Sequence, residues 1–190
     1  MVSCFLTHAE VVVDPEVPIE SWGLSVAGRR RAAAAHRLAW SPEVGRIVSS
    51  AERKAEETAA VLARAVGRGP DVEIEIEVEP ALGEIDRSAT GYLPPAEFEA
   101  VVVAFFARPE ESVRGWERAV DAQARIVAAV RALTRTGDVT VVSHGAVGAL
   151  LLADLRGVPI SRALDQPGMG SVFTFDPRRW RACSGWARVG

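Results

Sequence analysis

The sequence has no long apolar run. None of its 190 residues lies in a stretch near the roughly 18 consecutive apolar residues of a membrane-spanning helix. The opening MVSCFLTHAE reaches polar and ionisable side chains within about eight positions, which is too early for a signal peptide. From these two absences we expect a soluble, cytoplasmic protein that does not bind membranes.

Cysteine and excess positive charge are also scarce. Cys4 and Cys183 are the only cysteines, and without a secretion signal two such residues are more often reduced thiols than a bridge. The 25 Asp and Glu residues outnumber the 22 Lys and Arg residues, which gives a net charge of −3 at pH 7. Nucleic-acid binding usually needs a concentrated excess of basic residues, so we expect no nucleic-acid partner.

The overall amino-acid composition is typical of a globular protein. Hydrophobic residues make up 48% of the chain and charged residues 25%. A chain of this length can bury a core without disulfides or a structural metal. We therefore expect a single domain over residues 1–190, and nothing in the sequence indicates its oligomeric state.

Short apolar runs predict five strands. They lie at residues 2–7, 46–50, 72–78, 139–142 and 171–176. In the third of them, VEIEIEV, apolar residues alternate with glutamates, which predicts one buried and one solvated face. Apolar residues at helical spacing, together with capping residues, predict helices at residues 25–38, 55–66, 95–107 and 112–133 and from residue 145 onward.

The order of these elements predicts an α/β fold. Strands that alternate with helices favour a three-layer α/β/α sandwich around a mostly parallel sheet. Between the third and fourth strands two helices follow each other without a strand, so we expect a helical insertion at about residues 88–136.

Two of the predicted strands end in a histidine. His8 follows the strand at 2–7, and His144 follows the strand at 139–142. Ligands of open α/β sheets bind beyond the carboxyl ends of the strands, so both side chains are expected in one pocket. A neutral imidazole can attack an electrophilic centre, and a protonated one can stabilise negative charge. The pair therefore suits a covalent, two-step group transfer.

Six short segments strengthen this interpretation when they are taken in order. They are THAE at 7–10, WGLSVAG at 22–28, SSAERKAEETA at 49–59, LGE at 82–84, GWER at 115–118 and VSHG at 142–145. In order and spacing they resemble the RHGE, W-x-L-(S/T)-x-x-G, SSPLxRAxxTA, L-x-E, GGES and VSHG elements of the histidine phosphatase, or phosphoglycerate mutase-like, superfamily. The resemblance spans nearly the whole chain.

The resemblance implies a role for each of three residues. His8 is expected to be the phosphorylated nucleophile, and Glu84 the proton donor to the leaving group. His144 is expected to stabilise the transition state. The resemblance implies a small phosphorylated substrate. It implies no metal and no other cofactor.

The chain departs from the family pattern where phosphate would bind. Thr7 and Lys54 replace two phosphate-binding arginines, and neither a hydroxyl nor an ammonium reproduces the bidentate contacts of a guanidinium. Arg87 is either a replacement ligand or a solvent-facing loop arginine. The backbone at Gly145, at the start of a helix, can add N–H groups to the phosphate site whatever the side chains do.

We therefore expect a phosphomonoester hydrolase that is weak or specialised. Mutase activity is less favoured because nothing identifies a second phosphate site. The main alternative is a catalytically silent binding protein that retains the phosphatase fold. A zinc hydrolase is a third possibility, although the two histidines and Glu84 form no compact metal-ligand motif. Outside the motifs, His36 is interpreted as a surface or packing residue, and Glu117 as either a site-supporting acceptor or a helix-start carboxylate.

Overall fold

The computed structural model describes residues 2–35, 45–67 and 74–189, and in it a central sheet is covered by helices on both faces. The strand order is β3-β2-β4-β1-β5-β6, and β7 also pairs with β5. The strands are β1 (Ser3–Thr7), β2 (Ile47–Ser49), β3 (Ile76–Val78), β4 (Thr140–Ser143), β5 (Ser171–Asp176), β6 (Arg181–Ala182) and β7 (Ala187–Arg188). The four strands from β3 to β1 are parallel, while β5, β6 and β7 pair in antiparallel fashion.

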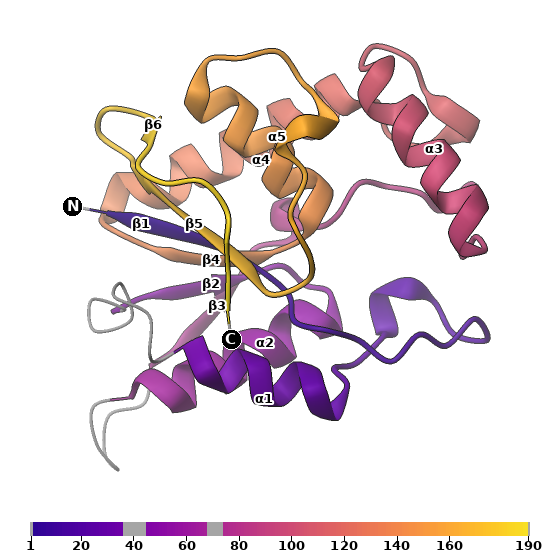
Figure 1. Ribbon diagram of the computed structural model, residues 1–190. Coiled ribbons are helices and arrows are strands. Elements are labelled where there is room, and N and C mark those ends of the chain that lie inside the picture. Colours follow the sequence, from indigo (N-terminus) through magenta and orange to yellow (C-terminus); the bar gives the residue numbers. More distant parts are fainter. Residues whose placement is uncertain (1, 36–44, 68–73, 190) are drawn as a thin grey trace.

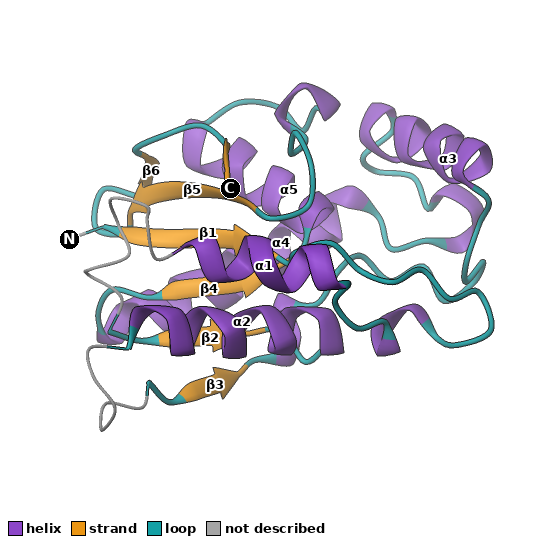
Figure 2. Cartoon of the chain, turned by 60° about the horizontal axis from the view of Figure 1, so that its bottom comes forward, coloured by secondary structure: helices purple, strands orange, loops and turns teal. Residues whose placement is uncertain are grey.

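Among the described residues, five α-helices build the outer layers. They are α1 (Val26–Ala34), α2 (Arg53–Val66), α3 (Pro95–Ala107), α4 (Ala119–Leu133) and α5 (Gly145–Arg156). Helices α1 and α2 pack together on one face of the sheet, and α4 and α5 pack together on the other, with α3 farther out (Figures 1 and 2). The expected α/β/α sandwich is confirmed. No helix in the described ranges is long and apolar enough to cross a membrane.

Alternation along β1 explains why both faces of the sheet are covered. Phe5 is fully buried and stacks on Phe173, with ring centroids 5.2 Å apart, on the side of α4 and α5. Its neighbour Leu6 belongs to a second apolar cluster, with residues of α2 such as Leu62. Successive side chains of a strand point to opposite faces, so one strand supplies both cores.

The pairing of β1 with β4 determines where the two histidines lie. The strands are parallel, and Thr7 lies opposite Ser143 at their carboxyl ends. The His8 amide then donates a 2.8 Å hydrogen bond to Ser143 O. Parallel pairing in this register brings His8 and His144 to the same edge of the sheet, as expected.

Two predicted elements differ from the observed ones. The strand expected at 72–78 extends only over Ile76–Val78, with residues 72 and 73 outside the described ranges, and Val78 is 50% exposed because β3 is an edge strand. The helix expected at 112–133 is broken, because Arg114 and Gly115 have positive φ angles of 53° and 82°. Helix α4 starts only at Ala119.

The end of the first predicted helix is only partly described. Helix α1 is capped by Ser25, whose hydroxyl accepts a 2.9 Å hydrogen bond from the Gly28 amide. It extends to Ala34, and the remainder of the predicted helix, with His36, lies outside the described residues.

Candidate active site

His8 is held with one ring nitrogen engaged and the other available. Its Nδ1 lies 2.8 Å from Ala9 O, and a carbonyl oxygen only accepts, so Nδ1 carries the proton. The Nε2 lone pair is therefore unprotonated. Burial lowers the pKa of His8 from 6.5 to about 4, against the raising effect of the Ala9 hydrogen bond. The imidazole is neutral near pH 7, as a nitrogen nucleophile must be.

His144 lies next to His8 and is fully buried. The two ring centroids are 5.3 Å apart and the planes are tilted by 60°. His144 Nε2 lies 2.7 Å from Ser50 Oγ and 3.1 Å from Glu52 Oε1. Its Nδ1 has no hydrogen-bond partner within the described part of the chain. Burial is the main cause that holds the pKa of His144 well below its ordinary value.

Glu84 reaches the same site from the loop that follows the short helix η4 (Pro80–Leu82). Its carboxylate accepts hydrogen bonds from the amides of Ala146 and Val147, each 3.2 Å long, at the N-terminus of α5. Burial and then the charge of Glu52 raise the pKa of Glu84, and the backbone donors oppose that rise. A raised pKa increases the protonated fraction that a general acid needs.

A guanidinium from α4 holds the loop that carries Glu84. Arg125 donates to the carbonyls of Ala81 and Gly83 at 2.9 Å and to that of Glu84 at 3.2 Å. It also binds both carboxylate oxygens of Glu117, at 3.0 and 2.8 Å. Of the two interpretations of Glu117, the structure therefore favours the site-supporting one.

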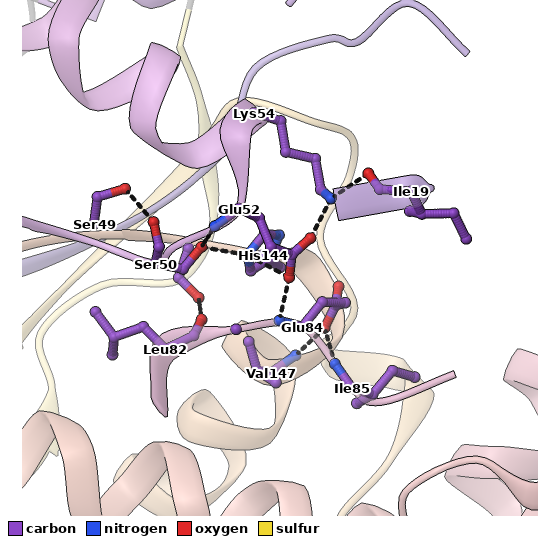
Figure 3. A network of polar contacts seen from close by, with 12 residues as sticks. Ile19, Ser49, Ser50, Glu52, Lys54, Leu82, Glu84, Ile85, His144 and Val147 are labelled. Carbon is purple, nitrogen blue, oxygen red and sulfur yellow. Dashed lines mark hydrogen bonds and ion pairs between the residues drawn. The ribbon is translucent and has the colours of Figure 1, made fainter. Parts of the chain in front are cut away.

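Glu52 is a site residue that the sequence reasoning missed. It occupies the leucine position of the SSPLxRA-like segment, between β2 and α2. Its Oε1 contacts His144 Nε2 and accepts a 2.8 Å hydrogen bond from the Glu84 amide, and its Oε2 pairs with Lys54 Nζ (Figure 3). An acidic residue at an apolar position of the pattern was the available signal.

The two expected cationic ligands both lie at the site. The buried Lys54 ammonium donates a 3.1 Å hydrogen bond to Ile19 O in addition to its pairing with Glu52. Arg87 lies with its guanidinium carbon 5.0 Å from the centroid of the Phe98 ring. Burial lowers the pKa of Arg87, and the charge of Glu84 opposes this. Arg87 therefore lies in the pocket wall and is not a freely solvated loop residue.

Thr7 is not among the residues that line the cavity described below, and its phosphate-binding role stays a prediction. Its hydroxyl is fully buried, donates to Gln166 Oε1 at 2.6 Å and accepts from the Ser171 amide at 3.0 Å. Gly145 lies beside the same glutamine, whose Nε2 would be 2.3 Å from a Cβ at this position. A residue larger than glycine at position 145 would displace Gln166.

The assembled side chains surround a cavity of about 260 Å³. Its lining residues are His8, Ile19, Glu20, Glu52, Lys54, Glu84, Ile85, Asp86 and Arg87. Within the described ranges no group of three or more His, Cys, Asp or Glu side chains could hold a metal ion. The arrangement combines a neutral imidazole, a second imidazole, a carboxyl with a raised pKa and two cations.

Comparisons with known proteins identify the family of the chain. The sequence profile of the histidine phosphatase superfamily (branch 1) matches residues 17–184. No curated protein sequence matches the chain significantly.

Several solved structures share the fold. A mycobacterial glucosyl-3-phosphoglycerate phosphatase in its native form is 24% identical, with a TM-score of 0.80 over 100% of this chain and 99% of that one. The same phosphatase in complex with VO3 is 25% identical, with a TM-score of 0.74 over 98% and 96% of the two chains. A candidate alpha-ribazole-5'-P phosphatase from Escherichia coli is 18% identical, with a TM-score of 0.75 over 100% and 99%.

Proposed function

This chain belongs to the histidine phosphatase superfamily and is a histidine-type phosphatase, and from that premise we propose that it hydrolyses phosphomonoesters through a phosphohistidine on His8. The observation that carries the proposal is the hydrogen bond between His8 Nδ1 and Ala9 O. It keeps the proton on Nδ1, so that the Nε2 lone pair is available for attack on phosphorus.

In the first step His8 Nε2 forms a bond to phosphorus while the bond from phosphorus to the leaving-group oxygen breaks. Glu84, in its protonated form, gives its proton to that oxygen, and the alcohol departs. The raised pKa of Glu84 supports this assignment, because the acid must be partly protonated near neutral pH.

In the second step a water molecule attacks the phosphohistidine. The Glu84 carboxylate takes a proton from this water, the bond between His8 Nε2 and phosphorus breaks, and inorganic phosphate leaves. Glu84 is then protonated again and His8 is neutral, so the free enzyme is restored. One carboxyl group thus serves as acid and then as base.

Negative charge on the transferring phosphoryl group needs donors close to it. His144 is in ring contact with His8, and Arg87 lines the same cavity, so we assign both to this charge. The backbone from Gly145 at the start of α5 adds the positive end of a helix dipole. We keep Lys54 as a candidate ligand.

The thinned set of phosphate ligands supports weak or specialised activity. The family's first arginine is replaced by the buried Thr7, and Lys54 is paired with Glu52. The pairing of Lys54 with Glu52 also favours the second candidate function, a binding protein without turnover. Among the described residues that line the pocket, it leaves Arg87 as the one cation without a carboxylate partner.

A screen of the purified protein against phosphomonoesters tests the proposal. Because the structural relatives include phosphatases named for glucosyl-3-phosphoglycerate and alpha-ribazole-5'-phosphate, phosphorylated sugar acids and nucleoside 5'-phosphates come first. We expect phosphate release that His8→Ala abolishes. Release that is equal in His8→Ala would exclude His8 as nucleophile, and binding of phosphate without release from any ester would favour the silent protein.

A further inference from the structure

One carboxylate in the cavity contacts two of the groups proposed above as phosphate ligands, His144 and Lys54. Glu52 Oε1 lies 3.1 Å from His144 Nε2 and 2.8 Å from the Glu84 amide nitrogen. Glu52 Oε2 pairs with Lys54 Nζ. An ammonium, an imidazole and a backbone N–H are thus all bound to one side-chain anion.

We propose that the Glu52 carboxylate occupies the phosphoryl subsite of the free enzyme and is displaced when the phosphate of a substrate binds. The inference rests on the proposed function, because it takes His144 and Lys54 as phosphate ligands. It makes Glu52 a specificity-determining residue, since a substrate must supply enough binding energy to displace this internal anion.

The chemistry of the donors supports this occupancy. An ionised carboxylate only accepts hydrogen bonds, as do the unprotonated oxygens of a phosphate, so the two compete for the same donors. The Glu52 carboxylate supplies the charge in each of its three contacts, and hydrogen bonds with a charged partner are the strong ones in proteins. Lys54 is 5% exposed and Glu52 13% exposed, so solvent screens their pair only weakly.

Charges on every side of the subsite decide how strongly the competition acts. Burial is the largest cause of the lowered pKa of His144, and the neighbouring His8 and the cations Lys54, Arg125 and Arg87 lower it further. Negative charge comes from Glu52 itself, from Glu84 in its ionised form, and from Glu20 and Asp86, which also line the cavity. If Glu52 stayed in place, the incoming phosphate would face an adjacent like charge, and like charges at close range oppose each other strongly in a poorly solvated pocket.

The pairing also explains how Lys54 can be buried without a ligand. A buried ammonium needs a partner, and Glu52 provides it in the free enzyme. After displacement the phosphate would become that partner, and Glu52 could move toward the open side of the cavity. Lys54 would then act as the second cation of the phosphate site, beside Arg87.

Binding of inorganic phosphate to Glu52 variants, measured by calorimetry, tests the proposal without turnover. Glu52→Leu places the residue of the family pattern at this position, and Glu52→Gln keeps an acceptor for the Glu84 amide but removes the charge. Glu56→Gln is the matched control, because it removes the same charge from an exposed position one turn later on α2. Melting curves confirm that each variant is folded.

We expect both Glu52 variants to bind phosphate about tenfold more tightly than the wild type or better, the effect of removing one nearby like charge. Glu56→Gln should change the dissociation constant less than about twofold, as exposed charges do. With Lys54→Met added, the gain from Glu52→Gln should shrink, because part of it comes from the released ammonium. Equal or weaker binding in a folded Glu52→Gln would overturn the proposal.

Ester hydrolysis by the wild type separates this inference from the proposed function. Tighter phosphate binding by the Glu52 variants, with no ester hydrolysed by any form, would support the resident anion and refute the phosphatase mechanism. Hydrolysis by the wild type, with no gain in phosphate affinity in either Glu52 variant, would support the mechanism and refute the resident anion.

Discussion

Replacement of Arg125 by methionine should both destabilise the fold and misplace Glu84, the proposed general acid. The change removes five hydrogen bonds, three to the carbonyls of residues 81, 83 and 84 and two to Glu117. Loss of one partner of a buried charged network costs about 3–5 kcal/mol. Because the Arg125 side chain is 27% exposed and water can replace part of these contacts, we expect about 2–4 kcal/mol.

The functional consequence follows from the position of Glu84 in the released loop. A shift of about 1 Å at a catalytic group can cost about 10²-fold in rate, so kcat should fall by that order. For a chain of this size the loss of stability corresponds to a melting temperature lower by roughly 5–15 °C. Arg125→Lys, which keeps the charge but loses the planar fork, should lie between the wild type and Arg125→Met.

Denaturant unfolding and steady-state kinetics on the same preparations measure both effects. Arg118→Met is the matched control, because it removes an arginine at the start of the same helix. The ion pair of Arg118 with Asp121 is exposed to solvent. It should leave stability and kcat nearly unchanged. If Arg125→Met unfolds within about 0.5 kcal/mol of the wild type and retains its kcat, the loop is not positioned by this network.

Three further predictions concern the pocket. In the proposed mechanism His8 reacts in its neutral form, and burial lowers its pKa to about 4. The value of kcat/KM should therefore persist down to about pH 4 before an acidic limb appears, and a limb near the ordinary 6.5 would contradict the burial argument. Glu84→Gln should lower kcat about 10²–10⁴-fold for alkyl phosphates and clearly less for nitrophenyl phosphate. The wild-type rate with alkyl phosphates should fall as pH rises through the raised pKa of Glu84. Equal losses for both esters would leave Glu84 with a structural role. Thr7→Arg alone should destabilise the fold, because Thr7 is fully buried. Combined with Gln166→Ala, which gives the guanidinium space, it should tighten phosphate binding in calorimetry by about ten- to hundredfold. No gain in affinity would show that the added arginine does not reach the phosphate site.

The sequence predicts best those parts of the fold that depend on local pattern. The apolar runs before His8 and His144 form parallel neighbouring strands, and that pairing alone brings the two imidazoles together. The break of the helix expected at 112–133 depends on positive φ angles at Arg114 and Gly115, which apolar periodicity does not report. Within the described residues of the alternating segment, strand β2 pairs only with Ile76, Glu77 and Val78, and apolar alternation does not report where such pairing begins.

The polar contacts of the site were harder to predict, because they depend on side chains from distant segments. Thr7 lies two residues after Phe5, so strand alternation directs it to the same covered face, where Gln166 binds its hydroxyl across 159 positions of sequence. The role of Glu52 likewise appears only when the segments after β2, β3 and β4 meet. Motif position identifies the types of residue in the pocket, whereas tertiary packing decides which of them are available to a ligand.

The most direct test of the central claim is identification of the covalent intermediate. A phosphomonoester labelled in its phosphoryl group is mixed with the enzyme and quenched in alkali, because the nitrogen–phosphorus bond of a phosphohistidine is labile in acid. Peptide mapping should then place the label on His8, with none in His8→Ala. Label on His144, or steady turnover with no labelled histidine, would contradict the mechanism.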